Sequence, residues 1–198
     1  MRRVIKIGGS LLLRTNLVTR LPVRIDELGG GAASETLVMV GGGEMIDAIR
    51  RLDRCRPLDP IATHWQCIEL LQQTLEIFHQ WFPSWNRIDT RAELEHAIEQ
   101  GFPTDRPSLV SVEAFYRRDV PADLPMDWRT TSDSLASLLA TLSGSDELVL
   151  VKSCQIDDGW TTASLMDKGI IDAAFPWHGA STWRLRVEAF APEPGPQR

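Results

Sequence analysis

The sequence predicts an α/β protein, a three-layer αβα sandwich with a mostly parallel central sheet. Short β-rich runs alternate with segments of helical spacing, as in chains whose strands are joined by crossover helices. The run Leu148 to Val151 is continuously apolar, which is typical of a parallel strand covered on both faces. The composition, 43% hydrophobic and 24% charged over 198 residues, is that of one globular domain. We expect this domain at residues 1–190 and a disordered, proline-rich tail at 191–198.

Two units, each a strand followed by glycines, open the chain. Val4 to Ile7 is the first expected strand and ends in the turn Gly8-Gly9-Ser10. Leu37 to Val40 repeats the pattern, because it meets Gly41-Gly42-Gly43 and then a helix over Glu44 to Arg50. Between the two units, the run of glycines at 29–31 indicates a flexible turn.

The middle of the chain predicts two helices. Apolar residues recur at intervals of three and four from Ile61 to Phe82, which indicates one long amphipathic helix ended by Pro83. A second helix should run from Thr90 to Gln100, where Thr90 and a glutamate three residues later form a capping box. Gly101 would end this helix.

The last third predicts further elements of both kinds. A short strand is expected near residues 109–111, followed by a turn of helix near 113–117. A helix should cover Ser134 to Leu142 and end at Gly144, ahead of the strand at 148–151. Arg184 to Phe190 alternates enough to form a final strand.

Charge and composition exclude several classes of function. The net charge of −6 and the pI near 5.2 leave no basic field for a nucleic-acid backbone. The longest apolar run, Leu11 to Leu13, falls far short of the roughly 20 residues that span a bilayer, and no signal-peptide pattern is present. We therefore expect a cytoplasmic protein without a membrane partner. Three cysteines without a CxxC pair and scattered histidines indicate neither a disulfide framework nor a metal site.

The glycine turns carry the main chemical signal. Glycine lets backbone N–H groups surround phosphate oxygens, and a helix N-terminus adds positive potential there. Lys6 lies beside the first turn, where an ammonium could bridge phosphate oxygens during transfer. Neither a Walker A pattern nor a GxGxxG fingerprint occurs, and each glycine cluster taken alone is more often a simple turn. Asp133, which follows Thr131 and Ser132, could also be a helix cap, although a functional role is favoured over capping alone and the two roles are compatible.

Three separated motifs resemble the amino acid kinase superfamily, which includes aspartate, acetylglutamate and uridylate kinases. They are Val4 to Ser10, Leu37 to Asp47 and Thr131 to Ala136, and the similarity runs in order from about Arg3 to Asp158. Further segments resemble a compact branch related to the furan-methyl-phosphate kinases of methanofuran biosynthesis, with relatives in tetrahydromethanopterin-linked one-carbon metabolism. These segments are Thr63-His64-Trp65, Pro125-Met126-Asp127-Trp128 and Leu150-Val151-Lys152-Ser153.

The resemblance implies an ATP-dependent kinase that transfers the γ-phosphoryl group to a phosphate or carboxylate oxygen of a small anionic molecule. A phosphorylated aminomethylfuran is the specific candidate, and Mg²⁺ would be held mainly by ATP. Lys6 would contact the transferred group, and Asp133 would position that lysine. The residues implied to bind nucleotide or phosphate are Gly8, Gly9, Ser10, Gly42, Gly43, Lys152 and Asp157. Those implied to bind substrate are Gly41, His64, Trp65, Thr131 and Ser132.

The sequence also departs from the family pattern. Larger members carry a second catalytic lysine late in the chain, and here Lys152 or Lys168 would have to replace it. The stretch from Ser153 to Gly159 is longer than the usual turn beside the nucleotide pocket. A catalytically degenerate nucleotide- or metabolite-binding protein is therefore the alternative. The seven tryptophans suit core filling or a dimer face, so a homo-oligomer or an assembly subunit remains open, although Trp65 or Trp128 could wall a substrate pocket.

Overall fold

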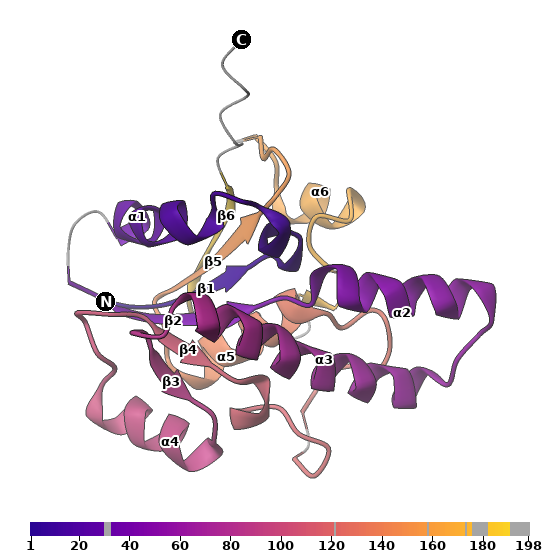
Figure 1. The fold of residues 1–198 in the computed structure, drawn as a ribbon, viewed down its shortest axis with the longest axis horizontal. Coiled ribbons are helices and arrows are strands. Elements are labelled where there is room, and N and C mark those ends of the chain that lie inside the picture. The colour runs from indigo at the N-terminus through magenta and orange to yellow at the C-terminus, as the bar shows by residue number, and fades with distance from the viewer. Residues whose placement is uncertain (30–32, 121, 158, 173, 176–181, 191–198) are drawn as a thin grey trace.

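The protein is built on one parallel sheet, described here from a computed structural model that covers residues 1–29, 33–120, 122–157, 159–172, 174–175 and 182–190. The sheet order is β3-β4-β2-β1-β5-β6, and all pairs of neighbouring strands run parallel (Figure 1). The strands are β1 (Arg2–Ile7), β2 (Glu35–Val40), β3 (Asn86–Ile88), β4 (Ser108–Val110), β5 (Glu147–Lys152) and β6 (Arg184–Ala189). The predicted α/β architecture is confirmed, with a wholly parallel sheet in this part of the chain.

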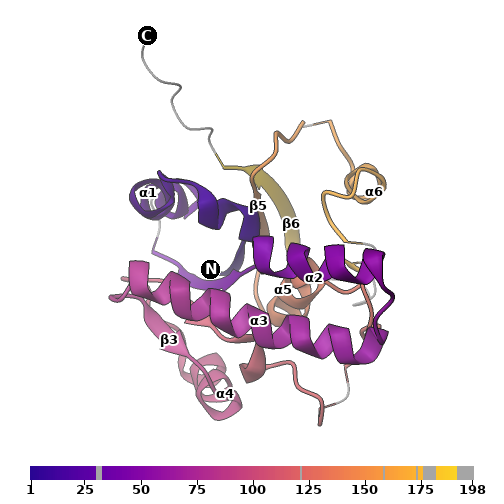
Figure 2. The ribbon, with the colours of Figure 1, turned by 45° about the vertical axis from the view of Figure 1, so that its right-hand side comes forward.

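Helices cover both faces of this sheet and form the outer layers. They are α1 (Leu17–Gly29), α2 (Gly43–Cys55), α3 (Pro60–Trp81), α4 (Arg91–Gln100), α5 (Ser132–Leu142) and α6 (Thr162–Asp167), with 3-10 turns η1 (Gly9–Leu13) and η2 (Val112–Ala114). The helices α2 and α3 lie side by side in both views (Figures 1 and 2). None of the helices in the described ranges is long and apolar enough to cross a membrane.

Alternation along the strands separates two apolar clusters, one on each face. Val4 of β1 packs with α5 and α6, whereas Ile5 and Ile7 pack with α1. In β5, Leu148 and Leu150 join the α5 cluster while the residues between and after them join the α1 cluster. Because side chains alternate across a strand, the last even-numbered positions of β1 and β5 face α5.

Most predicted elements form where the sequence indicates them. The capping box of α4 is present, since the Thr90 hydroxyl accepts from the Glu93 N–H at 3.3 Å and the Glu93 carboxylate accepts from the Thr90 N–H at 2.9 Å. Gly101 ends α4 with a φ of +93°, and Gly144 has a φ of +61° just after α5. The turn expected near 113–117 forms slightly earlier, as η2.

Three elements were not expected from the sequence. The helix α1 has Pro22 inside it, and Leu17, Leu21 and Ile25 form a buried stripe along it. The strand β3 has only three residues, and α6 only six. Gly29, expected in a flexible turn, is instead the last residue of α1, and the expected tail at 191–198 lies outside the described residues.

Candidate active site

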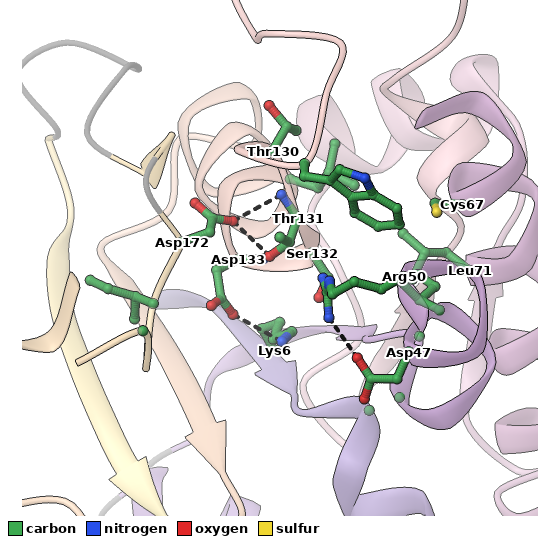
Figure 3. A pocket seen from close by; sticks show the side chains of 18 of the residues that line it. Lys6, Asp47, Arg50, Cys67, Leu71, Thr130, Thr131, Ser132, Asp133 and Asp172 are labelled. Carbon is green, nitrogen blue, oxygen red and sulfur yellow. Dashed lines mark hydrogen bonds and ion pairs between the residues drawn. The ribbon is translucent and has the colours of Figure 1, made fainter. Parts of the chain in front are cut away.

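A cavity of about 540 Å³ lies where the carboxyl ends of β1 and β5 meet the first turns of α2 and α5. Open α/β sheets bind ligands at this edge, because the loops after the strands converge there. The wall combines the two glycine turns, one side of α2 and α3, and the segment around Met166 and Asp172 (Figure 3).

Three buried charged groups meet at the floor of this cavity. The ammonium of Lys6 lies 2.9 Å from Oδ1 of Asp133, and that of Lys152 lies 2.6 Å from Oδ2. Their side chains are 6%, 5% and 12% exposed for Lys6, Asp133 and Lys152. The parallel register of β1 and β5 explains why the two lysines lie close together. Lys6 pairs with Leu150, so Lys152 is the next residue of β5 on the same face of the sheet. The helix α5 packs on this face and presents Asp133 from its first turn.

The environment of this trio favours an ionised aspartate. Burial alone would raise the pKa of Asp133, but the ammonium groups of Lys6 and Lys152 hold that pKa below its ordinary value. The pKa of Lys152 is lowered, first by burial and then by the charge of Lys6, while Asp133 opposes both effects. With both lysines protonated, the trio carries one excess positive charge, which suits an anionic ligand. The chain has only three lysines against eighteen arginines, and two of the three lie here.

The two glycine turns are in backbone contact beside the trio. A Cβ on Gly9 would lie 2.0 Å from the backbone nitrogen of Gly43, and Gly43 itself has a φ of +54°. Side chains are therefore excluded at both positions, and the N-terminus of α2 opens toward the cavity. Gly9, Ser10, Gly42 and Gly43 line the cavity.

Gly8 and Gly41 are not part of that lining. The Gly8 N–H donates to the Val151 carbonyl at 2.9 Å, and the Gly41 N–H donates to the Ile7 carbonyl at 2.9 Å. These two amides therefore extend the sheet and are already engaged. Gly41 still has to be small, because a Cβ there would lie 3.2 Å from Cε of Lys6.

The first turn of α5 is held by a carboxylate that the sequence did not indicate. Thr131 caps the helix, and its hydroxyl accepts from the Asp133 N–H at 3.4 Å. Asp172 accepts from the N–H and hydroxyl of both Thr131 and Ser134. Thr131, Ser132 and Asp172 all line the cavity (Figure 3). No local motif marks Asp172 in the sequence.

The wall formed by α2 and α3 contains a fixed arginine. The guanidinium of Arg50 lies 5.0 Å from the ring centre of Trp128 and 2.5 Å from the carboxylate of Asp47. The Trp128 indole N–H donates to Asp53 at 2.7 Å, which fixes the ring. Figure 3 shows Arg50 reaching from α2 toward the start of α5. Arg50 carried no sequence signal, since it is one of many arginines.

The histidine and tryptophan of the predicted motif in α3 point in different directions. His64 lines the cavity, and its Nε2 lies 2.8 Å from the Tyr116 hydroxyl. Burial lowers the pKa of His64, although the Asp127 backbone and charge oppose this, so the ring is neutral near pH 7. Trp65 stacks on Tyr116 with ring centres 5.1 Å apart and belongs to the core instead of the cavity.

The structure distinguishes between the two remaining lysine candidates. The Lys168 ammonium lies 4.7 Å from the Trp160 ring centre and is not part of the cavity lining, whereas Lys152 is. Asp157 is exposed, accepts from the Gly159 N–H at 2.9 Å and also lies outside the lining. In the described ranges, no group of three or more His, Cys, Asp or Glu residues is arranged to hold a metal ion.

Comparison with known proteins identifies the fold. No family model matches the sequence, and no curated relative does. Similar solved structures include UMP kinase from Ureaplasma parvum, with a TM-score of 0.62 and 16% identity over 96% of this chain and 89% of that one. UMP kinase from Bacillus anthracis has a TM-score of 0.60 and 14% identity over 96% of this chain and 86% of that one. Uridylate kinase from Archaeoglobus fulgidus has a TM-score of 0.53 and 17% identity over 82% of this chain and 70% of that one. The chain therefore has the α/β fold of the UMP kinases, which are members of the amino acid kinase superfamily.

Proposed function

We propose that the protein is an ATP-dependent kinase that transfers the γ-phosphoryl group to an anionic oxygen of a small molecule. The observation that carries this proposal is the buried trio of Lys6, Asp133 and Lys152, placed beside two touching glycine turns at the open edge of the sheet. A phosphoryl group in transfer needs positive charge and backbone N–H groups in fixed positions, and both are present here.

The residues would share the work by position and charge. An anionic oxygen of the acceptor attacks the γ-phosphorus, the bond to the bridging oxygen breaks, and ADP leaves, so no proton has to move. Lys6 and Lys152 would contact the oxygens of the transferred group, while Gly9 and Gly43 offer N–H groups. Asp133 is a positioning residue in this scheme, because it is ionised and each of its oxygens faces a lysine.

The donor set of the cavity fits a nucleotide polyphosphate that arrives with its own Mg²⁺. The close approach of Gly9 and Gly43 leaves a backbone cradle of the kind that accepts phosphate oxygens. When bound, Mg²⁺ neutralises part of the phosphate charge. We place it on the phosphates, because two carboxylates of the cavity already have partners: Asp133 has the two lysines, and Asp172 has the first turn of α5.

The acceptor would lie between α2, α3 and the start of α5. Arg50 offers a cation to a phosphate or carboxylate group, and Ile68 and Leu71 offer an apolar wall for a ring. Asp47 could meet an ammonium group of the acceptor. A phosphorylated aminomethylfuran carries all three features, so it is our specific candidate. UMP, after which two of the similar kinases are named, is the comparison compound.

One observation favours a second function, a nucleotide- or metabolite-binding protein without catalysis. Asp157, expected near the nucleotide base, is exposed and outside the cavity lining. The irregular stretch after β5 therefore contributes little to a base pocket, and a chain with a weakened nucleotide site could retain binding of a small anion alone.

Thermal unfolding with added ligand tests the nucleotide site first. Saturation of the folded state with MgATP at 100 times Kd should add about 2.7 kcal/mol, or roughly 5–11 °C in Tm for a chain of this length. Gly9→Val should abolish the shift, because the new side chain would clash with the Gly43 backbone. Ala92→Val places the same side chain at an exposed position of α4 and should keep the shift.

Phosphoryl transfer is then followed by ³¹P NMR with aminomethylfuran phosphate, UMP and a small carboxylate as acceptors. Formation of ADP together with a phosphorylated acceptor, lost in Lys6→Ala, supports the kinase. A nucleotide shift without transfer to any acceptor supports the binding protein. Absence of any shift at millimolar MgATP, with and without acceptor, would refute the kinase proposal.

A further inference from the structure

Asp172 holds the first turn of α5 through four hydrogen bonds to two residues. Its carboxylate accepts from the Thr131 N–H at 3.0 Å, the Thr131 hydroxyl at 2.7 Å, the Ser134 N–H at 3.0 Å and the Ser134 hydroxyl at 2.5 Å. A helix start leaves several N–H groups without partners inside the helix, and a carboxylate there is favoured by the helix dipole. Asp172 is about forty residues away in sequence, so this contact comes from tertiary structure.

The position of Asp172 is itself fixed on both sides. Ile171 is 2% exposed and packs in the core cluster with α5. On the other side, the Ala174 N–H donates to the Arg129 carbonyl at 3.0 Å, next to the start of α5. The carboxylate thus joins a well-anchored segment of the β5 to β6 connection to the helix that carries Asp133.

An ordinary helix cap would not need this arrangement, because Thr131 already caps α5 with its own hydroxyl. The contacts of Asp172 with Thr131 and Ser134 flank Asp133, the residue that meets the two lysines. A small rotation of the first turn would carry the Asp133 carboxylate off one lysine. Such misplacement is costly in sites that act by position and electrostatics.

We propose that Asp172 is a positioning residue, which locks the first turn of α5 so that Asp133 bridges Lys6 and Lys152, and which adds a negative charge that acts on Lys152. The geometric part stands independently of the activity. The consequence for catalysis rests on the kinase proposed above.

The charge of Asp172 gives the proposal a measurable signature. Three charged groups act on Lys152: Lys6 from β1, Asp133 from α5 and Asp172 from the segment after α6. Burial and Lys6 lower the pKa of Lys152, while Asp133 and Asp172 raise it. Removal of the Asp172 charge should therefore lower this pKa further. The charge of Asp172 acts on Lys152 whether or not the carboxylate positions Asp133, so the titration tests the charge, and kcat of a folded variant tests the positioning.

Lysine-selective NMR measures that titration without any assay of activity. With only three lysines, ¹³Cε-labelled protein gives three signals, which Lys6→Arg and Lys168→Arg variants assign. Three forms of the full chain are compared: the wild type, Asp172→Asn and Asp167→Asn. The last variant is the control, because Asp167 is an exposed residue of α6. Ser134→Ala removes one hydroxyl donor and keeps the charge. Circular dichroism confirms that each variant is folded over the pH range used.

The expected result is a Lys152 midpoint at lower pH in Asp172→Asn, with Lys168 unchanged and with wild-type midpoints in Asp167→Asn and Ser134→Ala. In the phosphoryl transfer assay, Asp172→Asn should reduce kcat about 10-fold or more, with a smaller change in KM for MgATP. The basic limb of its pH–activity profile, where activity falls as the pH rises, should shift to lower pH.

Two results would overturn the proposal. One is a Lys152 midpoint in Asp172→Asn equal to that of the wild type; the other is a wild-type kcat in a folded variant that has only lost thermal stability. If the wild type transfers no phosphoryl group, the kinase proposal fails by itself, and the NMR titration still tests the action of the Asp172 charge on Lys152.

Discussion

Replacement of Asp133 by asparagine tests the charge balance of the site most directly. The side chain keeps its shape, but the negative charge between the ammonium groups of Lys6 and Lys152, at 2.9 and 2.6 Å, disappears. Both lysine side chains are buried, so water can stabilise them only in part. The variant therefore contains two adjacent buried cations that have lost the carboxylate they share.

The expected loss follows from the burial of this group. Removal of one partner from a buried ion pair typically destabilises a protein by about 3–5 kcal/mol. For a domain of this length each kcal/mol lowers Tm by roughly 2–4 °C, so we expect Asp133→Asn to unfold about 6–20 °C below the wild type near pH 7. The deficit should shrink at alkaline pH, because the lowered pKa of Lys152 lets one cation deprotonate.

Urea unfolding followed by tryptophan fluorescence measures the free energy of unfolding at pH 7 and at pH 9.5. Asp119→Asn is the control, because it removes an aspartate from an exposed ion pair with Arg117. The control Tm should stay within about 2 °C of the wild type. Added phosphate should stabilise Asp133→Asn more than the control, since an anion can replace the lost charge. An Asn variant within about 1 kcal/mol of the wild type would refute the assignment of a net-positive, aspartate-dependent trio.

Four further predictions address the site and the scaffold. Lys152→Met should melt at or above the wild-type Tm, because burial and Lys6 disfavour the charge of Lys152. The same variant should transfer phosphoryl groups about 10²–10³-fold more slowly. A large fall in Tm would contradict the expected stability. The Tm difference between wild type and Asp133→Asn should vanish on acidification. The folded protein holds the pKa of Asp133 below the ordinary pKa of 3.8, so the ionised carboxylate stabilises the fold fully above pH 3.8. This stabilisation is lost as the pH falls toward the lowered pKa of the folded state. Thr90→Ala should cost about 1 kcal/mol in urea unfolding through loss of the α4 capping box and leave kcat unchanged, whereas a changed kcat would link α4 to the site. Burial raises the pKa of Cys67 to about 11, so at pH 8 only about one molecule in a thousand holds the thiolate, and mass spectrometry should find iodoacetamide labelling there far slower than at the two exposed cysteines.

Much of the fold could be predicted because its signals are local. Apolar spacing identified α3 from one stretch of chain, and the capping pair Thr90 and Glu93 identified the start of α4. The helix α1 was not predicted, and only packing of Leu17, Leu21 and Ile25 against the sheet reveals its buried stripe.

The candidate site could be predicted only in part. Lys6 and the glycines belong to a short motif, and Asp133 belongs to another, so family resemblance marked them. His64 and Trp65 were marked together, yet adjacent helix residues point in directions about 100° apart, so one faces the cavity and the other the core. Arg50 and Asp172 were missed, because an arginine on a helix and an aspartate in a loop carry no local pattern.

The sequence by itself determined the strand-and-glycine units and the parallel α/β architecture, because apolar runs, glycines and helical spacing are local patterns. Its family resemblance marked Lys6 and Asp133 as candidate site residues. Only the tertiary structure decided that Lys152 and not Lys168 joins them. That choice depends on the pairing of β1 with β5, which sets Lys6 and Lys152 on one face, and on the packing of α5 above it. The tertiary structure also brought Asp172 to the start of α5. Such contacts join residues far apart in the chain, and neither spacing nor composition encodes them.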